Sequence, residues 1–173
     1  GDGVTNGDEI NDSTNPLNNC EFVLTSITLA PSAAWNASDC DSDGLTNIEE
    51  VPDSLNYDPL TDTDPLDPDT DGDGVLDGTE VSNPTNPTLP LDPCSFNVGD
   101  ITLTPDTVWL NADCDGDGVT NGDEINDNTD PLDACEFVVA SQTLAPNAAW
   151  NSGDCDGDGV TNGDEINDNT DPL

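Results

Sequence analysis

The chain of 173 residues contains no lysine, no arginine and no histidine, whereas 39 of its residues are Asp or Glu. No side chain can neutralise these carboxylates, so a cation from solution has to do it. Without cations, self-repulsion and low hydrophobicity predict a disordered chain. The missing positive charge also argues against nucleic acid and anionic membrane surfaces as partners, because no basic group can meet a phosphate.

Apolar material is scarce as well. The chain has three Phe, three Trp, one Tyr and no Met, and the aromatic residues are spread along it. One large hydrophobic core is therefore not expected, and bound metal and disulfides would have to supply the stability that burial cannot. No apolar run approaches ~18 residues, so we expect no membrane span.

The acidic residues follow a fixed pattern. In the segment 113–124, Asp occupies positions 1, 3 and 5, Gly position 6, Asn position 9 and Glu position 12. This is the ligand order of a calcium loop. Gly118 would make the sharp turn, the Val119 carbonyl would face the ion, and Glu124 would close the shell with both oxygens.

The pattern occurs four times in full and once in truncated form, which is a strong repeat signal. We name the copies loop 1 (2–9, lacking its first positions), loop 2 (39–50), loop 3 (69–80), loop 4 (113–124) and loop 5 (154–165). The candidate ligands at positions 1, 3, 5, 7, 9 and 12 are Asp39, Asp41, Asp43, Leu45, Asn47 and Glu50 in loop 2; Asp69, Asp71, Asp73, Val75, Asp77 and Glu80 in loop 3; Asp113, Asp115, Asp117, Val119, Asn121 and Glu124 in loop 4; Asp154, Asp156, Asp158, Val160, Asn162 and Glu165 in loop 5; and Asp2, Val4, Asn6 and Glu9 in loop 1.

Three inserted segments separate the loops and also repeat. Each begins with a Cys, followed by Phe two positions later, Pro eleven later, Trp fifteen later and a second Cys 20 positions later. The β-rich residues 22–29, the bend at Pro31 and the returning Trp35 predict a small β-hairpin or β-arch in each insert. The Phe and Trp of one insert would form a single aromatic contact.

The predicted fold is therefore a mostly irregular repeat rod without a large core. Calcium loops with single helical turns would alternate with disulfide-closed β-hairpin modules, since Asn, Asp, Thr and Pro crowd the turn after each loop. The expected segments are a partial calcium repeat (1–17), insert 1 (18–38), a calcium repeat with an Asp-Pro connector (39–66), a calcium repeat without insert (67–93), insert 2 (94–112), a calcium repeat (113–134), insert 3 (135–153) and a last calcium repeat (154–173).

The six cysteines allow 15 pairings, and spacing alone does not choose between them. Threefold repetition favours local bridges, each worth roughly 3 kcal/mol in the chain-entropy model. Such disulfides indicate an oxidising, extracellular setting. The alternative is free thiols or a thiolate metal site, which the lack of CxxC and His disfavours. The favoured pairs are Cys20–Cys40, Cys94–Cys114 and Cys135–Cys155.

The loops, together with the Thr-Asp-Pro or Thr-Asn-Pro that follows at 129–131, 170–172 and 14–16, resemble the bacterial thrombospondin type 3 repeat. The resemblance implies a rod that wraps around calcium ions, found as a spacer or adhesive stalk in secreted and cell-surface proteins. It assigns ligands to the Asp at positions 1, 3 and 5, the carbonyl at 7 and the Glu at 12, with position 9 coordinating directly or through water. Five ions would neutralise 10 of the 39 negative charges, so we expect about one calcium per loop, or two, with Asp127 and Asp130 as further candidates.

The expected function is a structural calcium-binding rod at the bacterial cell surface or outside the cell. Because the chain begins inside a loop, we expect a segment of a longer filament, fibre or adhesin stalk, packed end to end on neighbouring repeats or copies of itself. The alternative is a dockerin-like, calcium-dependent protein-binding module, which needs helices after the loops. An enzyme is not expected, because every carboxylate cluster falls on calcium-loop spacing. The sequons at Asn11 and Asn36 would allow glycans.

Overall fold

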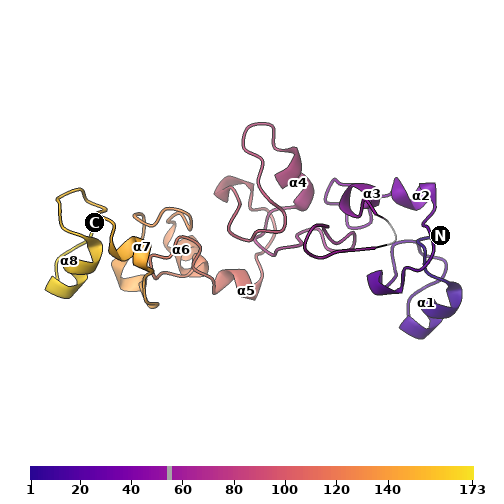
Figure 1. Cartoon of the computed structure of the whole chain (residues 1–173), viewed down its shortest axis with the longest axis horizontal. Helices are drawn as coiled ribbons and strands as arrows, with labels where there is room; N and C mark the ends of the chain where they lie inside the picture. Colours follow the sequence, from indigo (N-terminus) through magenta and orange to yellow (C-terminus); the bar gives the residue numbers. More distant parts are fainter. Residues whose placement is uncertain (54–55) are drawn as a thin grey trace. The chain divides into compact units, whose positions relative to one another are not determined.

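The computed structural model describes residues 1–53 and 56–173, which fold as two units, Gly1–Thr104 and Pro105–Leu173. Within each unit, short helices are joined by irregular segments (Figure 1). The described residues contain no β-strand. No helix among them is long and apolar enough to cross a membrane.

One set of helices begins at position 9 of the loops. Thr at position 8 caps several of them: the Thr120 hydroxyl accepts the Asp123 N–H at 3.2 Å, and Thr46 forms a capping box with Glu49. The loop sequence thus contains its own helix start. These helices are α1 (Asn6–Asp12), α3 (Asn47–Glu50), α4 (Asp77–Ser82), α6 (Asn121–Asp127) and α8 (Asn162–Asp168).

Three of these helices, α1, α6 and α8, have seven residues, or about two turns, which is longer than the single turn predicted. At the end of α6, Asn128 adopts a left-handed conformation with φ 62°. The Asn128 N–H then donates to the Ile125 carbonyl and the Thr129 N–H to the Glu124 carbonyl, as in a Schellman motif. Helices α3 and α4 end earlier because Pro52 and Pro84 follow them closely.

The prediction of β-hairpins in the inserts is wrong. Each insert instead contains a 3₁₀ turn and then a short α-helix. The 3₁₀ turns are η1 (Leu24–Ser26), η2 (Val98–Asp100) and η3 (Val139–Ser141), and the helices are α2 (Ala33–Asn36), α5 (Thr107–Leu110) and α7 (Ala148–Asn151).

The reason lies in the hydrogen bonds after the 3₁₀ turn. In insert 1 the N–H groups of Thr28 and Leu29 both donate to the carbonyl of Gly3, each at 3.0 Å. In insert 3 the Leu144 N–H donates to the Gly118 carbonyl at 2.9 Å. The extended residues therefore find their backbone partner in the preceding loop, and no second strand is needed to satisfy them.

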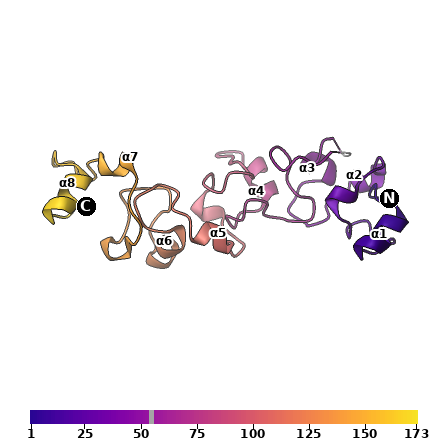
Figure 2. The ribbon, with the colours of Figure 1, turned by 60° about the horizontal axis from the view of Figure 1, so that its bottom comes forward.

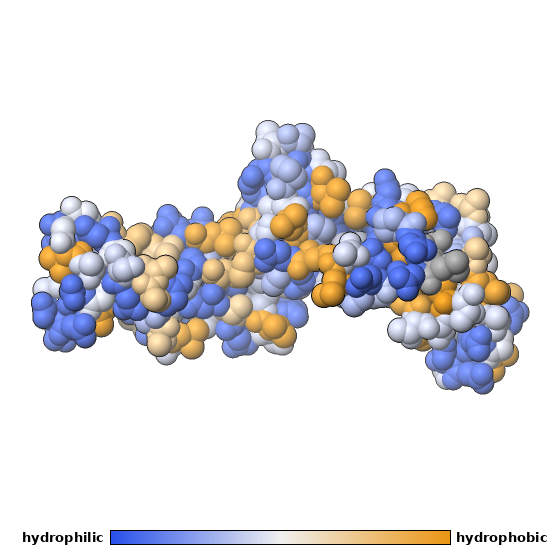
Figure 3. Space-filling view, viewed as in Figure 1, coloured by the Kyte–Doolittle hydropathy of each residue, from blue (hydrophilic) through white to orange (hydrophobic). Residues whose placement is uncertain are grey.

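Each unit contains a small apolar cluster that joins an insert to the loop before it. Phe22 and Trp35 pack edge to face with ring centroids 5.7 Å apart, and Phe137 and Trp150 do the same at 5.8 Å. This confirms the predicted aromatic contact for inserts 1 and 3. The third member of each cluster is the Val at loop position 7, Val4 in the first and Val119 in the second, so the insert covers that side of the loop. The cores stay small, and hydrophilic residues dominate the surface over α1 and α8 (Figure 3).

Candidate metal centres

The acidic side chains of each loop hold its backbone in shape. In loop 4, Asp113 accepts the Gly116 N–H at 2.7 Å with one oxygen and the Gly118 N–H at 3.0 Å with the other. Asp117 accepts the Val119 N–H at 2.7 Å through Oδ1. These local bonds orient the carboxylates and leave Oδ2 of Asp117 without a hydrogen-bond donor among the described residues.

The same arrangement recurs in the other loops. In all five, the Asp at position 5 accepts the N–H of position 7, at distances from 2.7 to 3.0 Å. In the four complete loops, one oxygen from each Asp at positions 1, 3 and 5 lies within 4.8 Å of the others. The structure thus brings together the three acidic positions that the sequence pattern selected in loops 2 to 5.

Two features require Gly at position 6 of loop 4. Gly118 has φ +94°, which L-residues with a side chain rarely adopt. A Cβ at Gly118 would also lie 2.8 Å from the Leu144 carbonyl oxygen, because insert 3 rests directly on the loop backbone. Gly159 in loop 5 has nearly the same φ, +95°, with nothing within 4 Å of its Cβ position.

The Glu at position 12 is buried in every loop, and in loops 2 and 4 it accepts no hydrogen bond from the part of the chain that the structure describes. Glu50 is 2% exposed and Glu124 0% exposed, and neither oxygen of either side chain accepts a hydrogen bond from the described residues. A buried carboxylate without a partner is costly, and the chain has no basic residue to pair with it. A hard divalent cation with oxygen ligands fits this donor set, and calcium takes six to eight such ligands.

The electrostatics of the loops lead to the same conclusion. Burial, followed by repulsion from Asp115 and Asp117, raises the pKa of Glu124 to about 9. Burial is also the main cause that raises the pKa of Asp115 to about 7. In loop 2, burial and the neighbouring aspartates raise the pKa of Glu50 to about 9. At neutral pH the empty loops therefore keep protons on Glu50 and Glu124 and partly on Asp115, so metal binding would release protons.

The loops differ in how deeply they are buried. The Asp triad of loop 5 is exposed, whereas Asp117 of loop 4 and Asp73 of loop 3 are 0% exposed. In loop 1, the side chains of Asp2 and Glu9 are both buried. Position 7, whose carbonyl is a candidate ligand, shows the same difference. The residue is buried where it is Val4, Val75 or Val119, whereas Val160 of loop 5 is exposed.

Position 9 has a structural role that the sequence reading did not anticipate. Asn162 Oδ1 accepts the Cys155 N–H at 2.9 Å, and its Nδ2 donates to the Trp150 carbonyl at 3.0 Å. Asn121 makes the equivalent bonds to Cys114 and Trp109. The side chain therefore ties loops 4 and 5 to the end of the insert before each of them. Its contribution to the ion, direct or through water, remains a prediction. The signal in the sequence was the pairing of Cys at position 2 with Asn at position 9, which loop 3 replaces by Thr and Asp.

Two of the predicted disulfides are confirmed. Cys20 is bonded to Cys40 and Cys135 to Cys155, with Cα–Cα distances of 5.3 and 5.4 Å. Cys94 and Cys114 are also disulfide-bonded. None of the six cysteines, all of which lie in the described part of the chain, is free, so the thiol alternative is wrong. Each bridge ends at position 2 of a loop, between two candidate ligands.

Comparison with known protein families gives one match. The model of the bacterial TSP3 repeat, a repeat that binds calcium, matches residues 1–19, 69–90, 113–134 and 154–173. These segments contain loops 1, 3, 4 and 5. No curated protein and no solved structure gives a significant match to the chain.

Proposed function

Because the chain carries bacterial thrombospondin type 3 repeats, which are calcium-binding, we propose that it is a structural calcium-binding rod stiffened by Ca²⁺ and disulfides. The rod would be a segment of a longer extracellular filament, fibre or adhesin stalk. The observation that carries the proposal is the pair of buried, unpartnered carboxylates Glu50 and Glu124 at position 12 of their loops. The chain has no basic side chain that could neutralise them.

The proposed ligands of each ion follow the loop pattern. The Asp at positions 1, 3 and 5 would each supply an oxygen, position 7 its carbonyl and position 12 its carboxylate. Position 9 would hold the loop to its insert, and in loop 3 the carboxylate of Asp77 would replace that amide. The structural support is the convergence of the Asp triads in loops 2 to 5.

The way in which the inserts connect loops supports the proposed rod function. Insert 3 contacts loop 4 through the Gly118 carbonyl and Val119, and it contacts loop 5 through Asn162 and the Cys155 disulfide. An ion that fixes a loop would therefore also fix the surface on which the next insert rests. The disulfides support an extracellular location.

Removal of calcium tests the proposal. Native mass spectrometry of the oxidised chain should show several bound Ca²⁺, about one per loop. Added EDTA should reduce the far-UV circular dichroism signal and enlarge the hydrodynamic radius, because the empty loops repel themselves. Equal ionic strength without chelator is the control. A chain that binds no calcium, or that keeps its signal and radius in EDTA, would refute the proposal.

A partner-binding, dockerin-like module remains the second candidate. The observation in its favour is that α1, α6 and α8 are full two-turn helices, each with a solvent-exposed Ile at the same position: Ile10, Ile125 and Ile166. Substitution of all three by Ser should leave calcium binding unchanged in either case. It would abolish calcium-dependent capture of a protein partner only if the helices dock one.

A further inference from the structure

Loops 2 and 3 contact each other directly, because no insert separates them in the sequence. Helices α3 and α4 lie next to each other in both views of the ribbon (Figures 1 and 2). The Gly78 N–H at the start of α4 donates to Asp43 Oδ2 of loop 2 at 2.8 Å. A Cβ at Gly78 would lie 2.4 Å from the Asp43 carbonyl oxygen, so the two backbones are too close to admit a side chain there.

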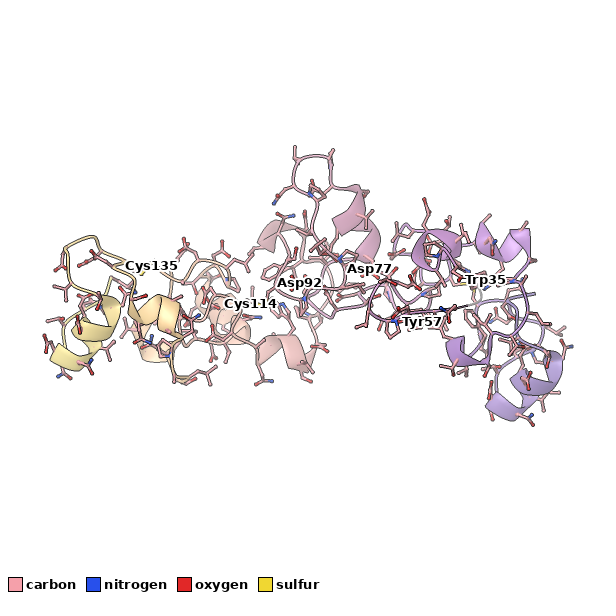
Figure 4. The ribbon with its side chains drawn as sticks, viewed as in Figure 1. Trp35, Tyr57, Asp77, Asp92, Cys114 and Cys135 are labelled. Atoms are coloured by element: carbon pink, nitrogen blue, oxygen red, sulfur yellow. A yellow bond between two sulfur atoms is a disulfide. The ribbon has the colours of Figure 1, made fainter. Side chains whose placement is uncertain are left out.

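This contact brings a carboxylate of loop 3 to the acidic group of loop 2. One oxygen each of Asp43, Glu50 and Asp77 lies within 4.8 Å of the others. All three side chains are buried, with 5%, 2% and 0% exposure. Asp77, labelled in Figure 4, is the first residue of α4.

The three carboxylates differ in their partners. Asp77 accepts the Thr70 N–H at 2.9 Å and the Thr70 hydroxyl at 2.6 Å. Asp43 is held by the Gly78 N–H described above. Glu50, in contrast, is buried with both oxygens unpartnered among the described residues. Two members of the group are thus fixed in place, and the third has its full ligand capacity available.

We propose that a divalent cation of the calcium type is bound between loops 2 and 3 by one oxygen each from Asp43, Glu50 and Asp77. The proposal rests on the calcium-binding function proposed above and extends it, since loop 3 then supplies a ligand to loop 2. The two loops would bind calcium as a coupled pair. Three buried carboxylates without a basic residue must either take up protons or bind a cation, and a divalent ion neutralises them while using their oxygens as ligands.

The composition of position 9 supports this assignment. Among the complete loops, loop 3 alone has Asp there, and loops 2, 4 and 5 have Asn. In loops 4 and 5 that Asn donates from Nδ2 to a Trp carbonyl, which a carboxylate would repel. In loop 3 an acid replaces the amide at the one junction between complete loops that lacks an insert.

The variant Asp77→Asn tests the proposal with little risk to the fold. Asn keeps an Oδ1 that can accept the Thr70 N–H, and it is the residue that the other complete loops already have at position 9. Asp67→Asn is the matched control, since Asp67 is exposed and its removal takes away the same charge nearby. We expect D77N to lose one bound Ca²⁺ in native mass spectrometry, or to bind one ion roughly ten- to a hundredfold more weakly in calorimetry, whereas D67N keeps the wild-type stoichiometry.

A double-mutant cycle then identifies which ion Asp77 serves. If Asp77 and Glu50 bind the same cation, D77N and Glu50→Gln will be strongly non-additive in calcium affinity, and D77N and Glu80→Gln nearly additive. The opposite pattern, or a D77N titration that matches D67N, would refute the cation site shared by loops 2 and 3. The proposed calcium-binding function of the chain would still stand. A wild-type chain that binds no calcium overturns both, so the two failures are distinguishable.

Discussion

Gly118 and Gly159 offer a direct measure of what an insert contributes to a calcium loop. Both occupy position 6, with φ of +94° and +95°. Insert 3 covers Gly118, and nothing lies within 4 Å of the Cβ position of Gly159. The substitutions Gly118→Ala and Gly159→Ala therefore impose the same backbone strain, and only the first also pushes against a neighbour.

The expected magnitudes follow from these two contributions. An L-residue in the left-handed region costs about 1–2 kcal/mol, so Gly159→Ala should reduce stability by that amount. At Gly118 the new methyl group would lie 2.8 Å from the Leu144 carbonyl oxygen and 3.0 Å from carbons of Gln142 and Pro146. Overpacking of this kind costs a further ~1–3 kcal/mol. Gly118→Ala should thus be the more damaging variant by that difference.

Two assays measure the difference. Urea unfolding in saturating calcium gives the loss of stability of each variant against the wild type. Hydrogen exchange followed by mass spectrometry reports the Leu144 amide, which donates to the Gly118 carbonyl. We expect faster exchange around Leu144 in Gly118→Ala and an unchanged rate in Gly159→Ala. Equal losses of stability, with Leu144 protected in both variants, would refute the docking of the insert on the loop.

Four further outcomes are expected. Calcium affinity should fall and proton release should rise as the pH drops from about 9 toward 7, because the pKa of Glu124 is about 9 and its proton must leave; calorimetry in buffers of different ionisation enthalpy would detect the protons. In EDTA the effect of pH on stability has the opposite sign. The folded chain binds the Glu124 proton more tightly than the unfolded chain, so any remaining folded stability should decline as pH rises from 4.5 through about 9. Thermal melts at several pH values would measure this decline. Asn162→Ala should cost about 1–3 kcal/mol in thermal unfolding, because the Cys155 N–H loses its acceptor and the Trp150 carbonyl keeps, among the described residues, only the Gly153 N–H as a donor. Replacement of Cys135 and Cys155 by Ser should lower the free energy of unfolding of the calcium-loaded chain by about 3 kcal/mol, as measured by urea unfolding. A loss near zero would mean that the disulfide adds no stability once calcium is bound.

The acidic triads could be predicted because everything that forms them is local. Asp113, Asp115 and Asp117 lie within five consecutive residues, and their hydrogen bonds reach only neighbouring amides. The disulfides of Cys20 and Cys135 followed from repetition. The sequence also contained the end of α6, since Asn128 and Thr129 form a recognisable helix C-terminus that the interpretation overlooked.

The inserts and the junction of loops 2 and 3 could not be predicted in the same way. The β-branched residues near Ile27 favour extended backbone, and the backbone after the 3₁₀ turn is extended. Their partner, however, is the carbonyl of Gly3, which no local pattern identifies. The proximity of Asp77 to Glu50 likewise depends on how the chain packs between them. Tertiary contacts therefore determine both the conformation of the inserts and the junction of loops 2 and 3.

The contact of each insert with the loop before it sets an order for the growing polypeptide. The Gly3 carbonyl accepts hydrogen bonds from the N–H groups of Thr28 and Leu29. The first loop is therefore completed only when that later segment has been synthesised. The Cys20 bridge must wait longer still, for Cys40 inside the next loop. Assembly would therefore proceed from the amino end in steps, each new segment finishing the one made just before it.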